Sequence, residues 1–83
     1  MASEPERIQV ELLGETFTVR GGASRDDILQ TAAYLNEQLG VLQTRHPSLS
    51  QRNLAILTAF HIADELLRVQ KDYEALVSML DAK

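Results

Sequence analysis

The chain has 83 residues and no cysteine, so it holds one small domain with neither disulfide bonds nor a thiolate metal site. A domain of this size buries only about 60% of its unfolded surface when it folds alone, so we expect it to self-associate. Twelve acidic residues against eight basic ones give a net charge of −4, which opposes binding to nucleic acid.

Residues 1–7 are polar and acidic and have no feature of a signal or transit peptide. No apolar run in the chain approaches the roughly 20 residues of a membrane-spanning helix. We therefore expect a disordered N-terminal segment on a cytoplasmic protein that does not enter a membrane.

Apolar and polar residues alternate over residues 8–20, which predicts two half-buried strands. We place a two-residue loop at Gly14–Glu15, because glycine suits the first central position of a type II′ turn. An isolated hairpin is marginally stable in water, so a helix should cover its apolar face. The predicted register pairs Leu12 with Phe17 and Val10 with Val19.

The next element is a helix expected from about residue 25 to residue 44. Gly21–Gly22 ends the strand, and Ser24 with Asp27 three residues later is typical of a helix N-terminus. Apolar residues recur at spacings of three and four, which makes one broad face that can cover the hairpin. This face contains Ile28, Ala32, Leu35, Leu39 and Leu42.

A second helix is expected after Pro47, because the residue before a proline is pushed out of the helical region. Ser48 followed by Gln51 again resembles a capping box. No proline or glycine occurs beyond this point, so the helix should exceed thirty residues.

This helix carries an apolar seam along its whole length, with the alternating spacing of a coiled coil. A second apolar row stops at Leu67. We therefore expect the second row to pack in the core of the head and the seam to contact another chain. We expect a homodimer, with a homotetramer and a purely intrachain helical pair as alternatives. The seam consists of Ala55, Ala59, Ile62, Leu66, Val69, Tyr73, Leu76 and Leu80, and the second row of Ile56, Phe60, Ala63 and Leu67.

The predicted fold class is α+β: a small ββα head followed by a long C-terminal helix that forms a coiled coil. Residues 1–7 form the disordered acidic N-terminus, 8–67 the head with the first half of the long helix, and 68–83 the coiled-coil extension. The predicted core consists of Ile8, Val10, Leu12, Phe17, Val19, Ile28, Leu35, Leu39, Ile56, Phe60 and Leu67.

A search for catalytic and metal-binding sets gives no assembled site, so we predict neither an enzyme nor a cofactor. His61 could share a metal with Asp64 and Glu65, but a helix histidine without a metal is the preferred interpretation. Four arginines flank the loops of the head and could steer an acidic partner. They are Arg20, Arg25, Arg45 and Arg52.

Three segments in this order resemble the ZapA family of bacterial cell-division proteins. Residues 13–19 (Leu-Gly-Glu-Thr-Phe-Thr-Val) are similar to its hydrophobic-Gly-x-x-hydrophobic-x-Val hairpin segment. Residues 32–39 (Ala-Ala-Tyr-Leu-Asn-Glu-Gln-Leu) resemble its Ala-Ala-x-Leu-Asn first helix. Residues 59–66 (Ala-Phe-His-Ile-Ala-Asp-Glu-Leu) resemble its Ala-Leu-Asn-Ile-Ala-x-Glu-Leu stretch, with His61 in place of asparagine.

The resemblance implies a protein without catalytic activity that binds the tubulin-like GTPase FtsZ and cross-links or aligns its filaments in the division ring at midcell. Members of the family contact FtsZ through basic residues near the hairpin turn and late in the first helix. Glu15, Thr18 and Gln43 occupy the matching positions here, so we assign partner binding to the four arginines instead.

Two other functions are compatible with these elements. A DNA-binding dimer of the repressor or antitoxin type has a similar size and presents a strand to the major groove. Glu11 and Glu15 on the outward strand face argue against it, and salt-dependent duplex binding would support it. A generic coiled-coil scaffold unrelated to division is the other alternative.

Overall fold

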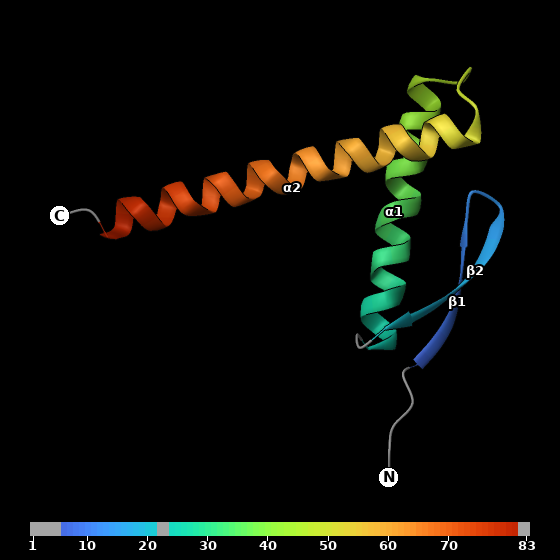
Figure 1. Cartoon of the computed structure of the whole chain (residues 1–83), viewed down its shortest axis with the longest axis horizontal. Helices are drawn as coiled ribbons and strands as arrows, with labels where there is room; N and C mark the ends of the chain where they lie inside the picture. The colour runs from blue at the N-terminus through green and yellow to red at the C-terminus, as the bar shows by residue number, and fades with distance from the viewer. Residues whose placement is uncertain (1–5, 22–23, 82–83) are drawn as a thin grey trace, which may run out of the picture.

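The computed structural model describes residues 6–21 and 24–81. It confirms the predicted order of a hairpin, a helix and a long second helix (Figure 1). The first strand begins before residue 8, so Glu6 and Arg7 belong to the hairpin, while residues 1–5 of the predicted disordered segment lie outside the described residues. The elements are β1 (Glu6–Leu12), β2 (Glu15–Gly21), α1 (Arg25–Arg45) and α2 (Gln51–Asp81).

The hairpin turn lies one residue earlier than predicted. Leu13 and Gly14 form the loop with φ of 54° and 77°, and two left-handed residues are what a type I′ turn requires. The predicted type II′ turn at Gly14–Glu15 is therefore wrong. Each pairing partner shifts by two residues, so every side chain keeps its predicted face. The observed pairs include Ile8 with Val19, Val10 with Phe17, and Leu12 with Glu15.

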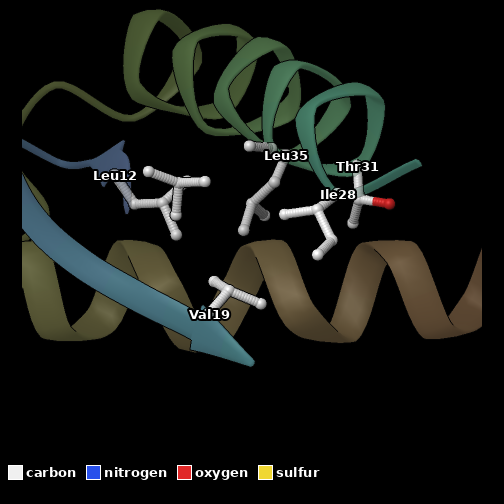
Figure 2. Close-up of a pocket in the computed structure, with 7 residues that line it drawn as sticks. Leu12, Val19, Ile28, Thr31 and Leu35 are labelled. Carbon is white, nitrogen blue, oxygen red and sulfur yellow. The ribbon is translucent and has the colours of Figure 1, made fainter. Parts of the chain in front are cut away.

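Helix α1 begins where the sequence predicts, because the Ser24 hydroxyl accepts a hydrogen bond of 3.1 Å from the backbone N–H of Asp27. Its first half covers the hairpin in a cluster of Ile8, Val10 and Ile28. A pocket of about 230 Å³ remains between them, where Leu12 and Val19 face Ile28 and Leu35 (Figure 2).

Helix α2 is capped by Ser50 and not by the predicted Ser48, since the Ser50 hydroxyl accepts from the N–H of Asn53 at 3.1 Å. The helix then crosses the second half of α1. Leu54 and Thr58 are fully buried at this crossing. A second core cluster joins Leu39, Leu42 and Leu54, with Leu13, Leu35 and Leu57 packed against it.

The second row of α2 is not in the core of the head, contrary to the prediction. Ile56, Phe60 and Leu67 are 58%, 74% and 56% exposed, and the predicted core residue Phe17 is 46% exposed. The residues of α2 that pack toward α1 are instead Leu54 and Thr58, which are buried, and Leu57 and His61, which are half-buried. Polar side chains interrupt this row, so its apolar periodicity is weak in the sequence.

The chain forms a flat, angular molecule, because α2 crosses α1 and then projects away from the head (Figure 1). Its extents are 52 × 50 × 15 Å and its radius of gyration is 17.0 Å. A compact domain of this length has a radius of gyration of about 12 Å. Much of α2 therefore lies outside the single-chain core.

Candidate interaction surfaces

The seam of α2 is exposed on one side of the helix from the head outward. Its first residues, Ala55 and Ala59, lie beside the hairpin, and Ile62 is half-buried. Beyond them the large side chains are more than half exposed although they are apolar. Their exposed fractions are 55% for Leu66, 63% for Val69, 67% for Tyr73, 54% for Leu76 and 73% for Leu80.

The first half of the seam also forms one wall of an apolar groove in the head, which we call the head groove. Its volume is about 590 Å³. The hairpin and α1 form the opposite wall, and Glu15 is the single charged residue in the lining. The lining consists of Leu12, Leu13, Glu15, Phe17, Leu35, Leu39, Ala55, Ala59, Ile62, Ala63 and Leu66.

A polar contact joins α1 to α2 beside the head groove. The Tyr34 hydroxyl donates a 2.9 Å hydrogen bond to Oε2 of Glu65, and this bond is the main cause that raises the pKa of Tyr34. Glu65 also lies 3.9 Å from Nε2 of His61. One turn further along, Arg68 forms an ion pair with Asp64 at 3.2 Å. The contact between Tyr34 and Glu65 is thus a polar link between the two helices.

The four predicted partner-binding arginines do not form one surface. Arg20 and Arg25 lie near the open end of the hairpin, whereas Arg45 and Arg52 flank the loop between the helices. The 21 residues of α1 separate the two pairs by about 30 Å. Arg7, which is not among the four predicted arginines, stands directly opposite Arg20 in the sheet. We call Arg7, Arg20 and Arg25 the basic patch; all three are exposed.

Arg7 can be found only with the observed strand register, because the predicted register pairs Arg20 with Gln9. Two arginines directly opposite each other on one sheet face repel, which is unfavourable for the hairpin itself. Such a pair raises the local positive potential on a chain whose net charge is −4.

The structure gives no support to the metal hypothesis for His61. Within residues 6–21 and 24–81, no three histidine or acidic side chains gather closely enough to hold a metal ion. In the same part of the chain, neither helix has the length and apolar character needed to cross a membrane. The features that stand out are the seam, the head groove and the basic patch.

These features define a class of small α+β protein in which a hairpin head carries a long helix whose apolar side is left open. Comparisons with known proteins identify the particular family. The model of the family "Cell division protein ZapA" matches residues 8–83. The chain belongs to the ZapA family of cell division proteins.

Individual relatives agree with this assignment. The ZapA of Shouchella clausii is 35% identical over 69 residues, which cover 83% of this chain and 88% of the relative. The ZapA of Geobacillus thermodenitrificans is 33% identical over 81 residues, which cover 96% and 89%. A solved structure described as a ZapA mutant dimer from Geobacillus stearothermophilus is similar with a TM-score of 0.75 and 28% identity, covering 98% of this chain and 94% of that one.

Proposed function

We propose that the chain is a non-enzymatic adaptor of cell division that self-associates through the seam of α2, binds FtsZ and cross-links its filaments. In this role it promotes and stabilises the division ring in the cytoplasm at midcell. The observation that carries the proposal is the apolar seam, which extends from the head groove to Leu80 with its large side chains exposed beyond Ile62.

The exposed surface of the chain supports a homodimer. The accessible surface is 7024 Å², whereas a compact monomer of 9.3 kDa exposes about 5,000 Å². The difference of about 2,000 Å² exceeds the roughly 800 Å² per partner of a standard interface. The structural relative from Geobacillus stearothermophilus is itself a dimer. A homotetramer is the larger assembly that the same seam could form.

Two linked heads explain how a protein without catalytic activity can organise filaments. A weak contact between one head and a filament becomes effective when a second head is tethered nearby. The basic patch is our preferred docking surface, because positive charge gathered at one end of the head can steer an acidic partner. Arg45 and Arg52 lie at the other end of α1 and are the weaker candidates.

The first experiment is sedimentation of the protein with GTP-assembled FtsZ filaments, with the pellet imaged for bundles. The parent protein should pellet with the filaments and bundle them. Ile62→Glu places a charge in the seam, so we expect its assembled mass and its bundling to fall while its helix content stays close to that of the parent. Ser78→Glu adds the same charge outside the seam and should behave like the parent. No sedimentation of the parent at modest salt would exclude FtsZ as the partner.

A second pair of variants tests the docking surface. Arg20→Glu reverses a charge in the basic patch and should reduce sedimentation with FtsZ while the assembled mass stays unchanged. Arg52→Glu makes the same change at the other end of α1 and should have a smaller effect. If Arg52→Glu has the larger effect, the basic patch is not the docking surface.

A further inference from the structure

The register of the hairpin determines which backbone groups point away from the sheet. Leu12 and Glu15 flank the two-residue loop and are joined by the hydrogen bond of the turn. Along an antiparallel ladder, hydrogen-bonded pairs alternate with pairs whose N–H and C=O groups point to the outer edges of the sheet. The pairs of this second kind are Glu11 with Thr16, Gln9 with Thr18, and Arg7 with Arg20.

Helix α1 covers the outer edge of β1 but leaves that of β2 open. The Asn36 side chain donates a 2.9 Å hydrogen bond from Nδ2 to the carbonyl oxygen of Glu11, which is one of the outward groups of β1. In the part of the chain that the structure describes, β2 pairs with β1 and with no third strand. The apolar face of the hairpin shows the same difference, since Val10 on β1 is 6% exposed and its partner Phe17 on β2 is 46% exposed.

The sequence of β2 does not protect this open edge. Natural edge strands avoid pairing with another chain through a proline, a bulge or a charged side chain. Residues 16–19 of β2 (Thr-Phe-Thr-Val) have neither proline nor charge, and the register is one-to-one, without a bulge. An extended segment of another protein can add to such an edge through main-chain hydrogen bonds.

The charges at the two ends of β2 favour an acidic occupant in one orientation. Arg7 and Arg20 form a non-hydrogen-bonded pair, in which side chains lie close together, so their positive charges repel. An acidic side chain beside Arg20 on an added strand reduces this repulsion. Glu15 at the other end of β2 disfavours an acidic residue there. The acidic end of an added segment should therefore lie at the open end of the hairpin.

We propose that an extended acidic segment of the docking partner adds to the outer edge of β2 as a third strand, with its acidic residues beside the basic patch. The outward N–H and C=O groups of Thr16, Thr18 and Arg20 then pair with the backbone of the segment. The inference rests on the docking of FtsZ at the basic patch proposed above, and it adds the form of the contact, which is backbone pairing along β2 with charge at its end.

Proline substitution tests the backbone contact, because proline has no N–H to donate. The N–H of Thr18 points to the outer edge, so Thr18→Pro removes it without breaking a hydrogen bond within the hairpin. We expect Thr18→Pro to weaken the apparent affinity for GTP-assembled FtsZ filaments by about fivefold, which corresponds to the loss of one backbone hydrogen bond. Sedimentation across a series of filament concentrations measures the change.

Two matched variants are the controls. Thr18→Val removes the hydroxyl and keeps the N–H, so it should sediment like the parent. Gln9→Pro makes the same proline change directly opposite, at the outer edge of β1, and should also sediment like the parent.

Hydrogen exchange gives a second measurement on the unchanged chain, which decides the question if Thr18→Pro does not fold. Mass spectrometry with fragmentation resolves the exchange of single N–H groups. On the filaments, the outward N–H groups of Thr16, Thr18 and Arg20 should exchange more slowly than in the free protein. The outward N–H of Gln9 on β1 should keep its rate.

The outcomes separate this inference from docking itself. If Arg20→Glu reduces sedimentation while Thr18→Pro binds like the parent, the partner docks through side chains and strand addition is overturned. Unchanged exchange of the outward N–H groups of β2 on the filaments overturns it as well. If Thr18→Pro lowers the assembled mass without FtsZ, the edge pairs with a second copy and not with an acidic segment. No sedimentation of the parent at modest salt overturns FtsZ docking together with this inference.

Discussion

The side chain with the least exposed surface among the described residues is polar. Thr58 has 0% exposure where α2 crosses α1, and its Oγ1 has no hydrogen-bond partner among the residues that the structure describes. Thr31 and Thr44 on α1 instead donate to the carbonyl oxygens of Asp27 and Gly40, at 2.8 and 3.0 Å. A buried hydroxyl without a partner costs about 1–3 kcal/mol, so Thr58 weakens the contact between the helices.

Replacing this hydroxyl with a methyl group should stabilise the protein. We expect Thr58→Val to raise the free energy of unfolding by about 1 kcal/mol, because it removes the unpaired group and keeps the shape of the side chain. Chemical denaturation at one fixed protein concentration measures the change. Thr44→Val, on the exposed surface, loses its hydrogen bond to Gly40 and should be neutral or slightly destabilising. A lower stability for Thr58→Val would mean that Thr58 has a hydrogen-bond partner in solution.

The hydrogen bond between Tyr34 and Glu65 gives the protein a pH dependence in the alkaline range. The bond raises the pKa of Tyr34 above its ordinary value of 10.0, with smaller contributions from desolvation and from the charges of Glu65 and Glu37. A raised pKa means that the contribution of the bond to stability is complete below pH 10 and is lost as the pH rises through the raised value. Alkaline pH should therefore loosen the crossing of α1 and α2.

An absorbance titration of the phenol tests this prediction. The chain has two tyrosines, so Tyr73→Phe leaves Tyr34 as the only one that titrates. In that background Glu65→Ala should lower the pKa of Tyr34 toward 10.0, and Glu37→Ala should lower it less. Equal effects of the two variants would show that charge, and not the hydrogen bond, dominates.

At the scale of the elements, two glycines with similar open surroundings should respond oppositely to alanine. A Cβ at Gly14 or at Gly40 would meet nothing within 4 Å. Gly14 has a φ of 77° in the turn, so Gly14→Ala should destabilise the protein by about 1–2 kcal/mol. Gly40 lies inside α1, where alanine is favoured by about 0.5–1 kcal/mol. Denaturation midpoints at equal concentration compare the two, and a neutral Gly14→Ala would contradict the type I′ turn.

The sequence predicts the elements better than it predicts the contacts between them. Alternation, the Ser24 cap and the long run without glycine or proline predict all four elements, because these signals are local. The predicted turn is one residue too late because Gly14 fits either central position of a two-residue loop. A left-handed leucine at position 13 is unfavourable by itself, and the sequence does not show that Leu13 packs on the second core cluster. The head-facing row of α2 was missed because Thr58 and His61 interrupt it. The basic patch needs the strand register, which places Arg7 opposite Arg20.

At the scale of the whole molecule, the head and the projecting helix divide two tasks. The head presents the basic patch at the open end of the hairpin, far from the seam along α1 and α2. Substitutions that change the charge of the basic patch should therefore leave self-association intact. Substitutions in the seam should leave the positive charge of the basic patch intact. Variants of this kind make it possible to separate binding of a filament from cross-linking of two filaments.

Mixed assemblies of competent and deficient heads provide that separation. We expect Arg20→Glu chains, refolded together with parent chains, to suppress bundling of FtsZ more than they suppress sedimentation. A dimer with one competent head still binds a filament, but cross-linking needs two competent heads in one assembly. Bundling by a dimer should therefore fall with the square of the fraction of parent chains, and less steeply for a tetramer, in which any two competent heads of the four suffice. Binding should fall more gradually than bundling in either case. Light scattering and pelleting across a series of mixing ratios measure the two curves. If the two curves run parallel, bundling does not depend on two heads in one assembly. Preparations mixed without refolding are the control, because their subunits have not exchanged.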